Sequence, residues 1–211
     1  PLDYRQQDKP EIDPSAQLPF EGSIYFVQET VSDTSYYTYY VKGDMVRMDI
    51  HSQCSNCEEE ENSILFDLKQ GTITALHPKR RLYMNLHVRP YIQDESGDYE
   101  VMQTRNHKKI HGQKCYQWRV KNKEQNTEIA YWVFDGNFDF FDDFLRLWNR
   151  TEKHSSYFLH IPETNGYFPM LSVERTSLRD KKMRLEVLNI NRTVLDDSLF
   201  TIPQDYKPYD R

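Results

Sequence analysis

Short segments rich in β-branched and aromatic residues, separated by polar turns, make up most of the chain after residue 20. In residues 44–50 the apolar side chains of Val46, Met48 and Ile50 alternate with charged ones, which is the pattern of a strand with one buried face. Such strands, joined by short turns, predict a meander of antiparallel hairpins. The first six strands are expected at residues 22–31, 36–42, 44–50, 63–68, 72–76 and 81–86.

Some of the later strands are apolar on both faces. Residues 129–134, with the sequence IAYWVF, carry an apolar side chain at every position, so other parts of the protein must cover both sides of this strand. Between Val187 and Leu188 the apolar alternation slips by one residue, which predicts a β-bulge or a bent strand. Further strands are expected at residues 114–121, 168–174 and 182–190.

One segment, residues 138–150, has the periodicity of a helix. Asp142 and Asp143 fall in its first turns, where the helix dipole favours negative charge, and residues 135–137 are expected to cap its N-terminus. The sequence therefore predicts a mainly β protein with one or two helices. The apolar residues that recur at helical spacing are Phe138, Phe141, Phe144, Leu145 and Trp148.

Composition sets the outer limits of the fold. Residues 1–19 contain four prolines among polar residues, so we expect a flexible N-terminal arm there and a single domain over residues 20–211. The 37% of apolar residues is enough for one sizeable core. The net charge of -6, with no dense stripe of Lys and Arg, disfavours a nucleic-acid-binding protein.

The chain has no segment that we expect to span a membrane. Its longest apolar run, residues 129–134, is too short to cross a bilayer as a helix. Because the sequence begins at Pro1 rather than Met, we expect a mature or trimmed product, with which export is compatible.

The three cysteines are candidates for chemistry. Cys54 and Cys57 are followed by the acidic run 58–61, which raises a thiol pKa and so disfavours redox catalysis. With His51 they would supply three of the four ligands of a zinc site. A disulfide between Cys54 and Cys57, or two free thiols, is the simpler interpretation. Cys115 is expected to be a buried, unreactive thiol.

His107, His111 and Cys115 are four residues apart, a spacing that would align three metal ligands on a helix. Gly112 and the β-rich residues 114–121 argue against a helix, and on a strand these residues would lie too far apart to share one ion. The sequence also contains no Gly-x-Ser-x-Gly, phosphate-binding Gly-rich or His-Glu-x-x-His motif. It therefore favours a binding protein that is not an enzyme and uses no cofactor.

The segments VKGDMVRMDI, SILFDLKQGTITALHP and RLYMNL, within residues 41–86, resemble the first half of the LolA/LolB-like lipoprotein carriers of the bacterial envelope. KKIHGQKCYQWRV, TEIAYWVF and LDDSLFTIPQDYK resemble an uncharacterised Bacteroidetes branch of that superfamily, a domain of unknown function. The resemblance implies an open, strongly bent antiparallel β-barrel with a helical lid over an apolar cavity. It also implies a location in the periplasm or at the outer membrane and is compatible with a lipid anchor upstream. Arg47 matches the position of an arginine implicated in lid closure or ligand handling in those carriers.

Three functional hypotheses follow. The first is a non-enzymatic envelope protein that holds a lipid or lipoprotein acyl chain, or another apolar ligand, between the sheet and the helix. The second is a structural or interaction module with a filled barrel, in which the Tyr-rich residues 36–40 bind an envelope protein partner. The third is a zinc-dependent enzyme that uses His107, His111 or the Cys54/Cys57 pair. For the first hypothesis the expected ligand-binding residues are Phe26, Tyr37, Tyr39, Arg47, Met48, Phe66, Met84, Trp118, Tyr131, Phe141, Phe144 and Trp148.

Overall fold

A computed structural model describes residues 18–51, 62–94, 97–149 and 152–209 of the protein. Within these residues all twelve strands belong to one sheet, in the order β12-β6-β5-β4-β3-β2-β1-β11-β10-β9-β8-β7. Neighbouring strands run antiparallel, except that β12 runs parallel to β6. The strands are β1 (Gly22–Thr30), β2 (Thr34–Lys42), β3 (Met45–His51), β4 (Asn62–Asp67), β5 (Thr72–His77), β6 (Leu82–Leu86), β7 (Tyr99–Ile110), β8 (Gln113–Asn122), β9 (Thr127–Asp135), β10 (Tyr167–Thr176), β11 (Lys181–Arg192) and β12 (Lys207–Pro208).

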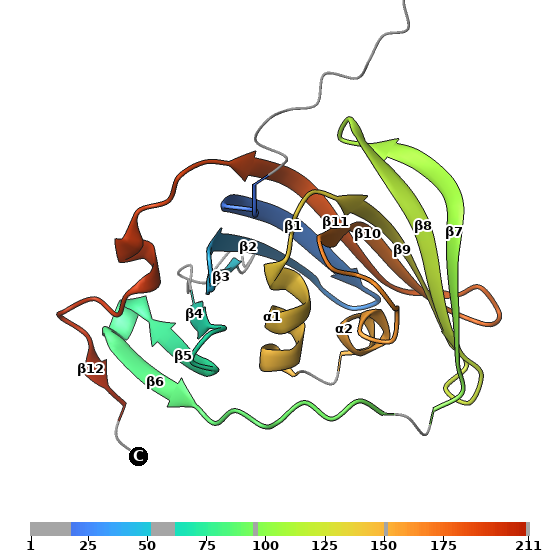
Figure 1. The fold of residues 1–211 in the computed structure, drawn as a ribbon. Coiled ribbons are helices and arrows are strands. Elements are labelled where there is room, and N and C mark those ends of the chain that lie inside the picture. Colours follow the sequence, from blue (N-terminus) through green and yellow to red (C-terminus); the bar gives the residue numbers. More distant parts are fainter. Residues whose placement is uncertain (1–17, 52–61, 95–96, 150–151, 210–211) are drawn as a thin grey trace, which may run out of the picture.

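The sheet curves strongly and stays open, because its edge strands β7 and β12 do not pair with each other. Figure 1 shows that the helices α1 (Phe140–Trp148) and α2 (Lys153–Phe158) lie inside the curve. Two short 3-10 helices, η2 (Pro78–Arg80) and η3 (Asp197–Phe200), complete the described elements. The expected fold class, a mainly β, open and strongly bent antiparallel barrel with one or two helices, is confirmed. No helix in the described part of the chain is long and apolar enough to cross a membrane.

Most elements lie where the periodicity predicts them. The strands β1–β6 and β8–β11 begin and end within two residues of their expected positions, and α1 lies within residues 138–150. The predicted bulge is present, since Phe26 pairs with Val187 and Tyr25 with Asn189, which leaves Leu188 without a partner on β1. The strand β7 and the helix α2 were not predicted, because β7 is mostly polar and α2 has only 6 residues.

The start of α1 differs from the expectation. Its N-cap residue is Asp139, whose side chain makes no capping hydrogen bond. Residues 135–137 instead form a turn fastened to the segment before β10, because the N–H groups of Gly136 and Phe138 both donate to the Gly166 carbonyl at 3.1 Å. The sequence could not show this contact, since Gly166 lies far along the chain.

Aromatic side chains fill the space between the helices and the concave face of the sheet. Phe144 of α1 is fully buried, and its ring centre lies 4.9 Å from that of Phe66 on β4 and 5.1 Å from that of Tyr39 on β2. Phe158 of α2 lies 5.3 Å from Tyr131 on β9. These contacts hold both helices inside the curve.

The two ends of the described chain lie on different parts of the sheet. Phe20 is anchored in the core, since its N–H donates to the Asn137 carbonyl at 2.8 Å and its ring lies 4.8 Å from that of Phe138. The arm expected over residues 1–19 lies outside the described residues except for Leu18 and Pro19. The single domain over residues 20–211 stays a prediction.

The C-terminal segment, residues 193–209, crosses the convex face of the sheet. Lys42 on β2 donates to the Leu195 carbonyl at 2.7 Å and forms an ion pair with Asp197 at 2.6 Å. Arg47 on β3 donates to the Leu199 carbonyl at 3.3 Å. The segment then ends in β12, which covers the edge of β6.

Candidate functional site

The space beneath the helices is almost completely filled by the protein's own side chains. Where α1 and α2 face the middle of the sheet, the cavity has a volume of about 20 Å³, which is room for about one water molecule. A pocket of about 150 Å³ adjoins this cavity and shares Phe26, Tyr39 and Leu145 with its lining. The cavity walls include Phe26, Tyr39, Tyr131, Phe141 and Phe168.

A row of mainly apolar side chains continues across the concave face beyond the helices. The members of this concave row, each the cross-strand neighbour of the next, are Tyr39 on β2, Met48 on β3, Ile64 on β4, Ala75 on β5 and Met84 on β6. Ile64 is two residues from Phe66, whose ring contacts α1, so the row faces the same side as the helices. It begins beneath α1 at Tyr39 and ends near the edge of the sheet at Met84.

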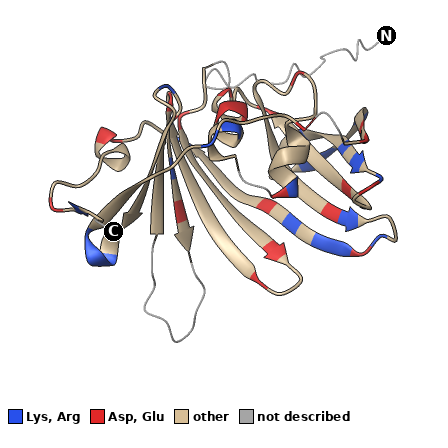
Figure 2. Cartoon of the chain, turned by 90° about the horizontal axis from the view of Figure 1, so that it is seen from below, with Lys and Arg blue, Asp and Glu red and all other residues tan. Residues whose placement is uncertain are grey.

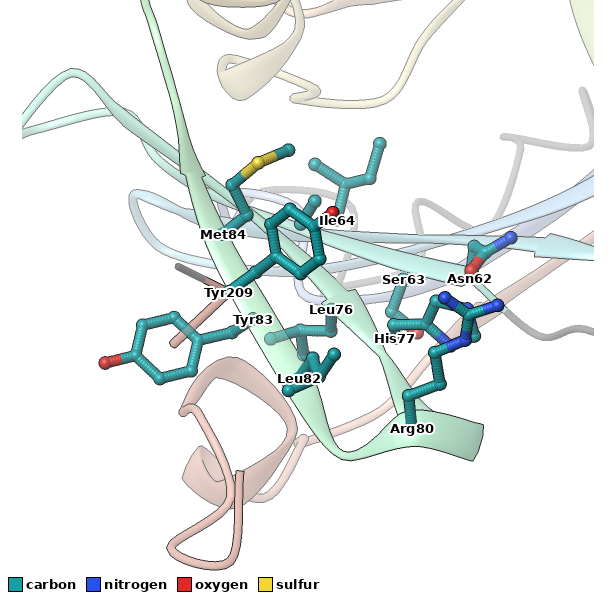
Figure 3. Close-up of a pocket in the computed structure, with 11 residues that line it drawn as sticks. Asn62, Ser63, Ile64, Leu76, His77, Arg80, Leu82, Tyr83, Met84 and Tyr209 are labelled. Carbon is teal, nitrogen blue, oxygen red and sulfur yellow. The ribbon is translucent and has the colours of Figure 1, made fainter. Parts of the chain in front are cut away.

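The outer end of the concave row opens into a pocket of about 330 Å³. Ile64, Ala75, Leu82 and Met84 contribute its apolar walls. Tyr209, which follows β12, also lines the pocket, and Figure 3 shows its ring turned towards Met84 and Ile64. Because Tyr209 is 51% exposed, its ring forms a rim rather than a part of the core.

The other end of this pocket is polar. Asn62, His77 and Arg80 line it, and Figure 3 shows them grouped away from Tyr209. Nδ1 of His77 is buried and has no hydrogen-bond partner, and the exposed Arg80 has no ion-pair partner among the described residues. A pocket with apolar walls and unpaired polar groups at one end suits a ligand that has an apolar chain and one anionic end.

A second pocket, of about 150 Å³, lies at the α1 end of the concave row. Its apolar lining includes Tyr37, Met48, Ile50 and Trp148. Met48 in this pocket is the cross-strand neighbour of Ile64 in the outer pocket, so the two pockets, which share no described lining residue, follow one another along the concave row. We call the two pockets together the concave groove. Nδ1 of His154 lies 3.7 Å from the Glu152 carboxylate at the edge of this pocket, and burial lowers the pKa of His154 although Glu152 opposes the shift.

The residues expected to bind a ligand fall into four groups. Phe26, Tyr39, Tyr131 and Phe141 line the filled space beneath the helices. Tyr37, Met48, Phe144, Trp148 and Met84 line the concave groove. Phe66 is buried beneath Phe144 and Trp148, and Trp118 is buried with its ring 4.7 Å from that of Tyr167. The fourth group is Arg47 alone.

Arg47 lies on the other face of the sheet. It precedes Met48 on β3 and therefore points to the convex side, because successive side chains of a strand point to opposite faces. Its guanidinium donates to Asp49 at 2.7 Å, to Ser63 at 3.1 Å and to the Leu199 carbonyl at 3.3 Å. Arg47 thus fastens the C-terminal segment to the sheet and does not line the concave groove.

Several residues of the outer pocket were not expected from the sequence to bind a ligand. Those that form its less polar walls include Ile64, Ala75, Leu82 and Tyr209. The first two could have been found, because the alternation of residues 63–68 and 72–76 places them on the same face as the apolar Phe66 and Ile73. No local pattern points to Tyr209, since its place depends on the parallel pairing of β12 with β6.

Of the residues considered for metal or thiol chemistry, those that the structure describes lie apart from the groove. Cys54 and Cys57, and with them the disulfide and zinc interpretations, lie outside the described residues. Cys115 is buried as expected, and burial raises the pKa of its thiol to about 11. His107 is exposed on β7, whereas Nε2 of His111 lies 2.8 Å from the Val187 carbonyl. The described residues contain no group of three or more His, Cys, Asp or Glu side chains that could hold a metal ion.

Solved structures share this architecture at low sequence identity. An uncharacterized conserved protein from Thermus thermophilus aligns with a TM-score of 0.51 and 11% identity, over 90% of this chain and 91% of that one. A chain of the Pseudomonas aeruginosa MucA/MucB complex aligns with a TM-score of 0.51 and 13% identity, over 88% of this chain and 56% of that one. This chain therefore spans little more than half of the MucA/MucB chain, and both likenesses concern the fold alone.

Sequence comparison gives a family assignment. No curated protein matches the chain. The family DUF4412, described as a domain of unknown function, matches residues 20–206, which include every described strand except β12. The chain belongs to the DUF4412 family.

Proposed function

We propose that the protein is a non-enzymatic binding protein of the bacterial cell envelope that holds a lipid acyl chain, or a similar apolar chain with an anionic end, in the concave groove. The observation that carries this proposal is the pocket of about 330 Å³ at the outer end of the concave row, which is apolar at Ile64 and Met84 and polar at His77 and Arg80. In this proposal most of the ligand occupies the outer pocket, whose described lining includes no residue of α1 or α2.

The dimensions and chemistry of the groove support such a ligand. The outer pocket crosses β4, β5 and β6 from Ile64 to Met84, which at about 4.8 Å between strands is about 10 Å, so it holds a segment of an acyl chain. Each methylene that leaves water contributes about 0.8 kcal/mol, so about ten buried methylenes contribute about 8 kcal/mol before the costs of ordering. Binding of this kind needs neither a cofactor nor a reactive group.

The envelope location rests on resemblance. The resemblance of sequence segments to LolA/LolB-like carriers, and to a Bacteroidetes branch of that superfamily, supports a location in the periplasm or at the outer membrane. A lipid anchor upstream is part of the same proposal. The fold shared with a chain of the MucA/MucB complex supports a partner protein in addition to a lipid or lipoprotein acyl chain.

The test is mass spectrometry of an organic extract of the purified protein, together with titration of a fluorescent fatty acid. We expect co-purified fatty acid or phospholipid, and displacement of the probe by a long-chain fatty acid but not by its methyl ester, because the ester has no anionic end for Arg80. A clean extract together with no binding of the probe would refute the proposal.

A filled interaction module is the second candidate. The cavity of only about 20 Å³ beneath the helices favours it. Tyr36 of β2 stacks on Tyr25 of β1 on the convex face, with ring centres 6.0 Å apart. Tyr25 is exposed and Tyr36 is half-buried, and the pair offers a surface for a protein partner. The strand itself is paired on both edges, with β1 and β3, so only its side chains are available. Failure of the extract and titration experiments would favour this candidate.

A further inference from the structure

The strand β7 is a long and exposed edge of the sheet. It has 12 residues and, in the described part of the chain, only β8 as a strand partner. Apart from Tyr99, Thr104 and Ile110, all of its residues are exposed. The opposite edge differs, because β12 covers part of β6. The register of β7 with β8 shifts between Gln103 and His107, so its regularly paired parts are residues 99–103 and 107–110. An edge strand presents a row of unpaired N–H and C=O groups to any extended chain that approaches it.

The hairpin formed by β7 and β8 is strongly basic. Residues 99–122 contain six basic residues and one acidic residue, Glu100, which gives a net charge of +5 in a chain whose net charge is -6. The rest of the protein is therefore strongly acidic. The basic residues of the hairpin are Arg105, Lys108, Lys109, Lys114, Arg119 and Lys121.

None of these six cations forms an ion pair with a described residue, although Lys121 has Glu100 and Glu128 as cross-strand neighbours. The basic strand β11 differs. On β11, Lys181 pairs with Glu29 at 3.6 Å and Arg184 with Glu186 at 2.6 Å. On the hairpin, Lys108 lies over the Trp132 ring, 4.2 Å from its centre, which holds the side chain in place without neutralising its charge. Figure 2 shows Lys and Arg along the strands at the right of the view.

The charge of the edge selects its partner. If β7 paired with β7 of a second copy, the basic side chains of the two strands would lie close together and repel each other. This repulsion protects the edge from self-association. The same charges attract an acidic chain. We propose that β7 binds an extended acidic segment of a partner protein, which adds to the sheet as a further strand through main-chain hydrogen bonds. This surface is separate from the concave groove.

The test uses a short fluorescein-labelled peptide in which glutamate alternates with valine, followed by fluorescence anisotropy with the whole chain. The double variant Arg105→Glu/Lys108→Glu reverses two exposed charges of β7. We expect it to weaken binding roughly tenfold or more, because attraction becomes repulsion, and we expect wild-type binding to weaken with added salt. The matched control, Lys69→Glu/Lys182→Glu, changes the net charge equally at exposed positions away from β7 and should bind like the wild type.

One further probe distinguishes strand addition from charge alone. A peptide of the same sequence that is N-methylated at every residue has no main-chain N–H to donate from either edge, so it cannot form the ladder and should not bind. Thermal unfolding and titration of the concave groove with the fluorescent fatty acid show whether each variant is folded, since neither Arg105 nor Lys108 lines the groove.

Four results would overturn the inference. They are equal binding by the double variant and its control, undiminished binding of the N-methylated peptide, no binding of the peptide by the wild type, and binding of phosphatidylglycerol vesicles in place of the peptide. The last result would identify the hairpin as a contact for an anionic membrane surface.

Discussion

Filling the outer pocket with a side chain should abolish the binding of an acyl chain. Ala75 lies in the concave row between Ile64 and Met84 and is only half-buried, so Ala75→Phe places a ring in the pocket of about 330 Å³ without displacing buried atoms. A ring there excludes about four methylenes of the ligand, and at about 0.8 kcal/mol for each methylene the loss is about 3 kcal/mol. The dissociation constant should therefore rise by about two orders of magnitude.

The assay is displacement of a fluorescent fatty acid, with thermal unfolding as the check of folding. Thr72→Phe is the matched control, because Thr72 lies on the same strand with its side chain on the opposite, convex face and is exposed. We expect the control to bind like the wild type. If Ala75→Phe binds with wild-type affinity while it unfolds at the wild-type temperature, the concave row is not the binding site and the proposed function fails.

Three further predictions concern stability. Phe144→Asp should lower the free energy of unfolding by more than about 2 kcal/mol, because it buries an unpaired charge, whereas an unchanged urea midpoint would mean that α1 does not pack as described. Gly22→Ala should lower the free energy of unfolding more than Gly43→Ala in the same urea assay. The reason is that a Cβ on Gly22 would lie 2.0 Å from the Asn191 carbonyl oxygen, whereas a Cβ on Gly43 would meet no atom within 4 Å. Equal losses of unfolding free energy would contradict this close approach. Burial lowers the pKa of His154, so the unfolded chain binds more protons than the folded one, and the free energy of unfolding should fall as the pH drops below about 6.5. His154→Gln should make the free energy of unfolding depend less on pH in this range. An unchanged pH dependence would contradict the lowered pKa of His154.

The strand pattern was largely readable because one buried face imposes a period of two on the sequence. Val46, Met48 and Ile50 show this period, and the slip at Leu188 marks the bulge in β11. The strand β7 escaped detection because an exposed edge strand has no buried face to impose a pattern. The helix α2 escaped because one and a half turns are too short to establish a period of 3.6.

The site was only partly predictable. Met48, Met84 and Trp148 were named and do line the concave groove, since apolar residues on the inner face of a curved sheet are candidates for both core and pocket. Which of them pack and which stay open depends on where the helices lie. Arg47 shows what the sequence could and could not predict. That it lies on the face opposite to its neighbour Met48 follows from strand alternation. Its hydrogen bond to the Leu199 carbonyl could not be predicted, because it joins segments far apart in the chain.

The sequence by itself determined ten of the twelve described strands, the main helix, the bulge and the presence of an aromatic core, because each depends on the spacing of apolar side chains over a few residues. The tertiary structure alone decided which volume is filled. The rings of Phe141 on α1 and Phe158 on α2 lie 5.3 Å apart and line the cavity of about 20 Å³ beneath the helices. The strand β12 brings Tyr209 to the rim of the outer pocket. Both results depend on contacts between residues distant in the chain, whose geometry is set by the curvature of the whole sheet and leaves no local pattern in the sequence.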